Sequence, residues 1–91
     1  MKDRQLQNIE KQLGNADEEI KILRKSWAKE ISELSHNPAF DPYSKKGEAK
    51  LADVAEKYAE LIVDAENRYD NLVDLYNKRA EELEAEGQNN N

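Results

Sequence analysis

The chain has 91 residues, of which 37% are hydrophobic and 37% charged, and its 14 Lys and Arg residues against 20 Asp and Glu residues give a net charge of −6. This length allows one small domain, and the acidic balance disfavours direct binding to nucleic acid or to an anionic membrane. The sequence has no cysteine, which excludes disulfides and thiolate metal sites, and no apolar run suited to a signal peptide or a membrane span, so we expect a cytoplasmic protein.

The first periodic segment predicts a helix over about 3–36. Its apolar residues recur at alternating intervals of three and four, a period typical of a helix that packs along a partner helix. Gly14 lies outside this apolar stripe and should cost about 1 kcal/mol relative to Ala. The stripe consists of Leu6, Ile9, Leu13, Ala16, Ile20, Leu23, Trp27, Ile31 and Leu34.

Both prolines of the chain lie in a break over about 37–44. Pro38 keeps Asn37 out of the helical region, so the first helix should stop near His36. We interpret the break as a true reversal, which makes the two helices antiparallel. His36 is the only histidine, and a place at a helix C-terminus, where its imidazole meets the helix dipole favourably, explains it better than catalysis does.

The second helix has two candidate starts. Asp41 before a proline is a good N-cap, and Ser44 is the alternative, so the helix should begin within 42–45. We expect Phe40 and Tyr43 to form an apolar plug that closes this end of the hairpin.

The segment over about 45–86 predicts the second helix. Its seam slips at Arg79, and Gly87 is a natural C-terminal breaker, so the single hairpin domain should occupy 1–87 and leave 88–91 as a disordered polar tail. The seam consists of Leu51, Ala55, Tyr58, Ile62, Ala65, Tyr69, Leu72, Tyr76 and Leu83. Acid-to-base pairs at i,i+4 should support both helices, and they are Asp17–Lys21, Asp53–Lys57, Asp64–Arg68 and Asp74–Lys78.

Aromatic residues should anchor the core between the helices. Trp27 should be buried against the turn that contains Ala55, Tyr58 and Ala59, where small residues leave room for its ring. An aromatic stripe can also form a ligand box, but at helical spacing it is more often core. The anchors are Trp27, Tyr58, Tyr69 and Tyr76.

The flanks of the second helix predict an interaction surface. One partner helix covers only the central seam, so the apolar flanking residues would remain exposed to solvent in a monomer. We therefore expect self-association, with a dimer that forms a four-helix bundle through the second helix; a different protein that covers the same flanks is the alternative. The interaction residues are Val54, Leu61, Val73 and Leu75.

Acidic residues line the outward side of the second helix. They include no Glu-x-x-His pair of the kind that holds metal ions in helical bundles, so we expect neither a metal nor a cofactor. The acidic face could imitate a phosphate backbone, although such a row is usually a solvated surface. A basic patch on the first helix, Lys21, Arg24, Lys25 and Lys29, could be attracted to this face in a neighbouring molecule. The acidic face consists of Asp53, Glu56, Glu60, Asp70, Asp74 and Glu81.

The sequence as a whole predicts an all-α, coiled-coil-like hairpin with no catalytic constellation. We expect a non-enzymatic protein-interaction module, such as an assembly, scaffolding or adaptor protein. The alternative is an acidic inhibitor that occupies the nucleic-acid-binding groove of a partner protein.

Overall fold

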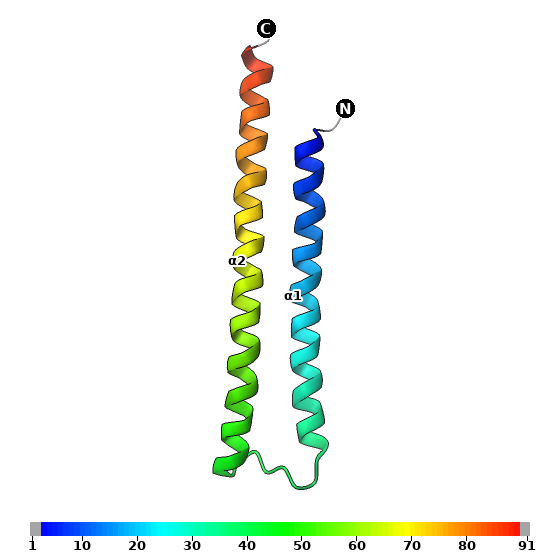
Figure 1. The fold of residues 1–91 in the computed structure, drawn as a ribbon, viewed down its shortest axis with the longest axis vertical. Helices are drawn as coiled ribbons and strands as arrows, with labels where there is room; N and C mark the ends of the chain where they lie inside the picture. The colour runs from blue at the N-terminus through cyan, green and yellow to red at the C-terminus, as the bar shows by residue number, and fades with distance from the viewer. Residues whose placement is uncertain (1–2, 90–91) are drawn as a thin grey trace.

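The computed structural model describes residues 3–89 as two helices joined by a short loop (Figure 1). Helix α1 spans Arg4–His36 and helix α2 spans Lys45–Asn89. The helices lie side by side and antiparallel, so α1 begins and α2 ends at the end opposite the loop. The Cα atoms extend over 72 × 20 × 11 Å, the shape of one layer of two helices. The prediction of an all-α two-helix hairpin is confirmed.

Helix α1 has a polar cap at each end. The backbone N–H of Leu6 donates to Asp3 Oδ1 over 3.0 Å, which satisfies one of the free donors of the first turn. The helix ends at His36 because Asn37, restricted by the following proline, has extended dihedrals of φ −78° and ψ 118°. The ring N–H at Nδ1 of His36 donates to the Ser32 carbonyl oxygen over 2.6 Å. This histidine therefore completes a helix terminus.

Ser44, and not Asp41, caps the start of α2. The hydroxyl oxygen of Ser44 accepts from the backbone N–H of Gly47 over 3.0 Å, as an N-cap does with the third helical residue. The Asp41 carboxylate instead accepts from the N–H of Tyr43 over 2.9 Å and so holds a tight turn inside the loop. Of the two predicted starts, the structure has the later one.

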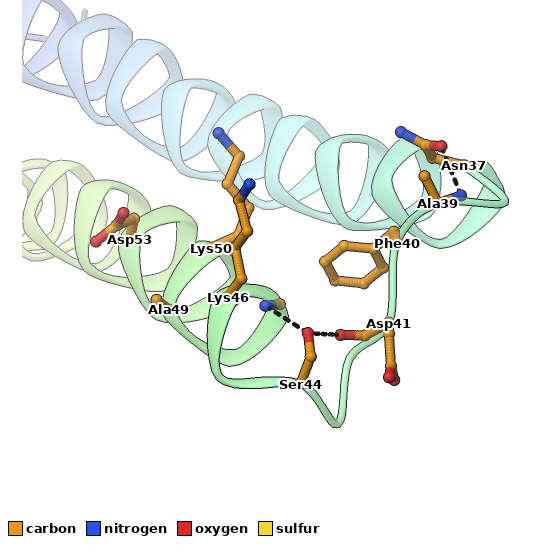
Figure 2. A pocket seen from close by; sticks show the side chains of 10 residues that line it. Asn37, Ala39, Phe40, Asp41, Ser44, Lys46, Ala49, Lys50 and Asp53 are labelled. Atoms are coloured by element: carbon orange, nitrogen blue, oxygen red, sulfur yellow. Dashed lines mark hydrogen bonds between the residues drawn. The ribbon is translucent and has the colours of Figure 1, made fainter.

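Gly47 lies where the loop folds back onto the first turn of α2. It is buried, and a Cβ atom built on it would lie 1.8 Å from the Asp41 carbonyl oxygen. The Ser44 hydroxyl donates to the same carbonyl oxygen over 2.8 Å, which fixes the loop at this close approach (Figure 2). Only a residue without a side chain fits here, a requirement that the sequence pattern did not reveal.

The prediction that two aromatic residues plug the end of the hairpin is wrong for one of them, Tyr43. Phe40 is partly buried, and its ring lies inside the bend of the loop, between the end of α1 and the start of α2 (Figure 2). Tyr43, in contrast, is 90% exposed. The turn held by Asp41 directs the Tyr43 side chain into solvent, so Phe40 alone of the two closes the hairpin.

Helix α2 continues past its expected end. We predicted that Gly87 would stop the helix near 86, but the backbone is helical to Asn89, so the prediction of a disordered tail is wrong for 88–89. A glycine ends a helix by adopting positive φ, and none of the glycines in the described chain does so. Residues 90–91 lie outside the described part.

The core is a single strip between the helices. Its largest cluster joins Val54, Tyr58 and Ile62 of α2 to partly buried Leu23, Trp27, Ile31 and Leu34 of α1. No large side chain of the described residues is completely enclosed. Each helix thus buries one stripe and leaves the rest of its surface open. In the described chain the buried apolar residues are Ile9, Ala16, Val54, Tyr58, Ile62 and Ala65.

Two glycine substitutions should change stability in opposite directions. Gly47→Ala should lower the free energy of unfolding by about 1–3 kcal/mol, because its methyl group would push the Asp41 carbonyl away from Ser44. Gly14→Ala should raise it by about 1 kcal/mol, because a Cβ at Gly14 meets nothing within 4 Å and Ala favours the helix. Urea unfolding of the two variants measures both effects, and equal effects of the same sign would contradict this account of the loop.

Candidate functional site

Two ion pairs between the helices identify the two broad faces of the hairpin. Arg24 Nη2 lies 3.3 Å from Glu66 Oε1, and Arg68 Nη2 lies 2.6 Å from Glu19 Oε1. Because a helix turns about 100° per residue, Glu19 and Arg24 flank the α1 stripe from opposite sides, and Glu66 and Arg68 do the same on α2. One pair therefore lies on each face of the single layer.

The first face, which we call the Trp27 face, is the more apolar. On α1, a shallow and mainly apolar hollow is lined by Trp27, Ala28 and Ile31 beside Arg24. On α2, Ala59 lies one heptad before Glu66 and Val63 lies one turn before it, so both belong to the same side. Ala59 is exposed and Val63 is 52% exposed. The Trp27 face consists of Arg24, Trp27, Ala28, Ile31, Ala59, Val63 and Glu66.

The second face, which we call the Leu61 face, has isolated apolar residues. Leu61 is 43% exposed and Leu75 is 53% exposed, and Arg68 lies midway between them along the same side of α2. The groove beside Leu75 is lined mainly by polar side chains, including Gln12 and Lys78. The Leu61 face consists of Glu19, Leu61, Arg68 and Leu75.

The predicted interaction residues do not share one surface. Leu61 and Leu75 lie exposed on the Leu61 face, whereas Val73 is partly buried and lies on the side of the Trp27 face. Val54 is wrong as a flank residue, because it is 5% exposed and belongs to the central core cluster. Val63 was missed because it lies outside both the heptad seam and the two flanks that the pattern indicated.

Ile22 is a second exposed residue that sequence reasoning missed. It is 54% exposed on α1, outside the apolar stripe and on the side of the Leu61 face. A single apolar residue outside the periodic stripe gives no signal above the background of surface hydrophobics, which is why the pattern did not indicate it.

The predicted aromatic anchors lie along the seam, but they differ in burial. Tyr58 is buried, while Tyr69 and Tyr76 are partly buried. Trp27 stacks on Tyr58, with ring centroids 6.1 Å apart and ring planes 5° from parallel. Trp27 therefore contacts the expected turn, but the expectation that it is buried there is wrong, because its side chain is only partly buried. Two helices have no third element to cover the outer side of this indole.

A polar cluster borders the aromatic stack. Lys57 Nζ lies 3.3 Å from Glu30 Oε2 and 4.9 Å from the centroid of the Tyr58 ring. The Tyr58 hydroxyl donates to Glu30, and this hydrogen bond is the main cause that lowers the pKa of Glu30 and raises the pKa of Tyr58. The cluster therefore joins the two helices at the level of the core.

Two bases that we expected to pair within α2 bridge to α1 instead. Lys57 pairs with Glu30 rather than with Asp53, and Arg68 pairs with Glu19 rather than with Asp64. The predicted pair of Asp17 and Lys21 is present at 3.0 Å, and it raises the pKa of Lys21. Pairing across the hairpin holds the helices in register, which local i,i+4 pairing cannot do.

Arg79, where the apolar seam slips, clasps the open end of the hairpin. Its Nε and Nη2 groups donate to Asp3 Oδ1 and Oδ2 over 3.3 and 3.0 Å, and Nη1 donates to Glu82 over 3.2 Å. Both Arg79 and Asp3 are partly buried. The fork geometry of the guanidinium suits such a bidentate contact, and the same Asp3 also caps α1. At Arg79, an ion pair therefore joins the two helices in place of an apolar contact.

The remaining charged groups of the described chain are mostly exposed. The six residues of the predicted acidic face are all exposed along the outer side of α2 and form no ion pair among the described residues. No group of three or more side chains suited to hold a metal ion occurs within residues 3–89. The hollow beneath Phe40 is lined by Asp41, Lys46, Lys50 and Asp53, whose charges are balanced (Figure 2).

Comparison with known proteins gives no indication of function, so a functional proposal has to be argued from the geometry of the hairpin. No family model matches the chain, and no curated protein or solved structure matches it. Neither helix, over the part of the chain that the structure describes, combines the length and the apolar character needed to cross a membrane.

The clasp should make stability depend on pH on the acid side. The hydrogen bond from Arg79, and next that from the Leu6 N–H, lower the pKa of Asp3 from its usual 3.8. The stability that this carboxylate contributes is therefore fully present above 3.8 and is lost as the pH falls through the lowered pKa. Asp3→Asn keeps a capping oxygen but removes the charge, so it should reduce the loss of thermal stability between neutral and strongly acidic pH.

Arg79→Gln is the matched variant for this measurement. It should reduce the acid-side loss to a similar extent, and the double variant should reduce it no further, because both changes remove the same interaction. An unchanged pH profile for Asp3→Asn would contradict the assignment.

Proposed function

We propose that the protein is a non-enzymatic protein-interaction module, an assembly, scaffolding or adaptor protein that binds partners through apolar helix faces. The observation that carries this proposal is the single layer of two helices, 11 Å in its thin dimension, with large aliphatic side chains exposed on both broad faces. Leu61 and Leu75 on one face and Val63 on the other are about half exposed. Apolar side chains repeated along a helix face are the usual means by which one helix binds another.

The polar features support binding rather than chemistry. The described ion pairs either cap and link the helices or lie within one helix, so no charged cluster is held ready around a pocket. The chain also presents no strand edge within residues 3–89, which leaves helix-to-helix packing as the available mode of recognition.

An acidic inhibitor of a nucleic-acid-binding protein is the second candidate. The exposed carboxylates of Asp53, Glu60, Asp74 and Glu81 follow one line along α2 at multiples of seven residues, which favours this hypothesis. The line is interrupted at its centre by Asn67. A groove built for a regular phosphate row would meet a gap there, so we rank this function second.

Site-specific photo-crosslinking in the source cell tests the proposal. A photoreactive residue at Leu61 or at Val63 should yield a defined protein adduct, because these side chains lie on the two apolar faces. The same residue at Lys11, exposed on the outer side of α1, is the control and should yield none. Adducts from Leu61 and Val63 that are no stronger than those from Lys11 would contradict the interaction module.

Position Asn67 separates the two candidate functions in the same experiment. It lies in the middle of the acidic face, so a basic groove bound there should crosslink from Asn67. When the crosslinking is repeated in a cell lysate, that adduct should no longer form at high salt concentration, whereas adducts formed by apolar packing should still form.

A further inference from the structure

We propose that the Trp27 face is the docking site for a second copy of this chain. In the resulting four-helix bundle, α1 of each copy lies on α2 of the other, and the loops of both copies lie at the same end. This inference rests on the proposed function and adds the partner, the face and the orientation. It replaces the expectation from the sequence that the dimer forms through the second helix.

The distribution of apolar surface favours the Trp27 face over the Leu61 face. On the Trp27 face, the apolar side chains of Trp27, Ala28 and Ile31 adjoin one another on α1, and the hollow beside them is mainly apolar. On the Leu61 face, the two leucines are separated by Arg68, and the adjoining grooves, lined mostly by polar residues, are less apolar than the hollow beside Trp27. A dry interface needs an apolar centre, and the Trp27 face offers the larger one.

Side-chain sizes on the Trp27 face are complementary between the two helices. The α1 side carries the large side chains of Trp27 and Ile31. The α2 side carries the medium-sized Val63 and the small side chains of Ala59 and of Ala52, which lies one heptad earlier on the same side. Large residues of one copy can therefore pack onto small residues of the other, twice over in a symmetric dimer. Two α1 helices placed against each other would instead oppose large residues to large ones.

Charge complementarity on the same face determines which helix of the second copy contacts α1. The α1 side carries Lys21, Arg24 and Asp17 near its centre, which leaves one net positive charge after Asp17 pairs with Lys21. The α2 side carries Glu66 and Asp70, with no base between Ala52 and Asn77 on that side. Contact of α2 with α2 would oppose acids to acids, so the charges favour α1 on α2.

A two-fold axis parallel to the helices satisfies both requirements. Such an axis preserves height along the hairpin, so Arg24 would lie level with Glu66 of the second copy, as it lies level with its own Glu66. The two arginines and two glutamates then alternate around the axis. Every helix also gains an antiparallel neighbour, the arrangement found in four-helix bundles. The loops of both copies lie at the same end.

The available area is sufficient for a stable dimer. A specific interface needs about 800 Å² from each partner. Both helices contribute to the broad face over the length of α1, which is about 50 Å, and with a width of 20 Å its area is on the order of 1,000 Å². Contact over most of this area meets the requirement. The second copy would also cover the outer side of the Trp27 indole, which α2 leaves partly exposed.

Sedimentation velocity of face-specific variants tests the docking site. Ala59→Glu places a charge at the centre of the Trp27 face and should weaken the dimer by more than about tenfold in Kd. Leu61→Glu is the matched control, because it introduces the same charge two residues further along α2 but on the other face. It should leave the dimer unchanged. Both sites are exposed, and circular dichroism should show that both variants keep their helices.

Trp27 reports on the same equilibrium without a label, because it is the only tryptophan. Its fluorescence emission should shift to shorter wavelength as the wild-type protein is concentrated, and it should not shift in Ala59→Glu. A dimer that is split by Leu61→Glu and not by Ala59→Glu would overturn this inference while leaving the interaction module intact. A helical monomer with concentration-independent emission would also overturn it, whereas the crosslinking experiment would still test the proposed function.

The orientation has its own measurement. The chain lacks cysteine, so Tyr43→Cys at the exposed loop carries a single spin label. In the proposed dimer both loops lie at one end, so the two labels should be much closer than the 72 Å length of the hairpin. A label separation near that full length would overturn the arrangement with both loops at one end.

Discussion

Each helix of this protein has a single neighbour, and the rest of the structure follows from that constraint. Two cylinders in contact bury one stripe each, so even Trp27 in the main cluster keeps one side towards solvent. A core of this kind gives little room for the burial that stabilises larger domains. The chain adds close-fitting ends: Gly47 lets the loop pack directly on α2, and Arg79 joins the far end of α2 to the cap of α1.

The hairpin could be predicted because its determinants are local. Heptad spacing marks the seams, and Pro38 ends the first helix through a steric effect on its immediate neighbour. The packing of Gly47 could not be predicted, because it depends on the carbonyl of Asp41 six residues earlier, after the loop has folded back. The end of α2 was misplaced for a related reason, since Gly87 breaks a helix only where some contact favours positive φ.

The candidate surface could be predicted only in part. Leu61 and Leu75 stand out as large apolar residues beside a seam, and they are exposed as expected. Val54 lies at the same heptad position as these two, yet it is buried, because the burial of a flanking residue depends on the local twist of the two helices. The pattern could not predict the ion pairs either. Arg68 has one acid four residues earlier in α2, Asp64, and another on α1, Glu19, and it pairs with Glu19.

Ion pairs and apolar contacts have different roles on these faces. The pairs of Arg24 with Glu66 and of Arg68 with Glu19 are exposed, so each adds little stability, and salt weakens them further. Their main effect is on the register of the two helices, because a shift of one helix along the other by one turn would separate both pairs at once. The same division applies to a partner on the Trp27 face. Burial of the indole supplies affinity, while the excess of base on α1 and of acid on α2 selects the helix that docks there.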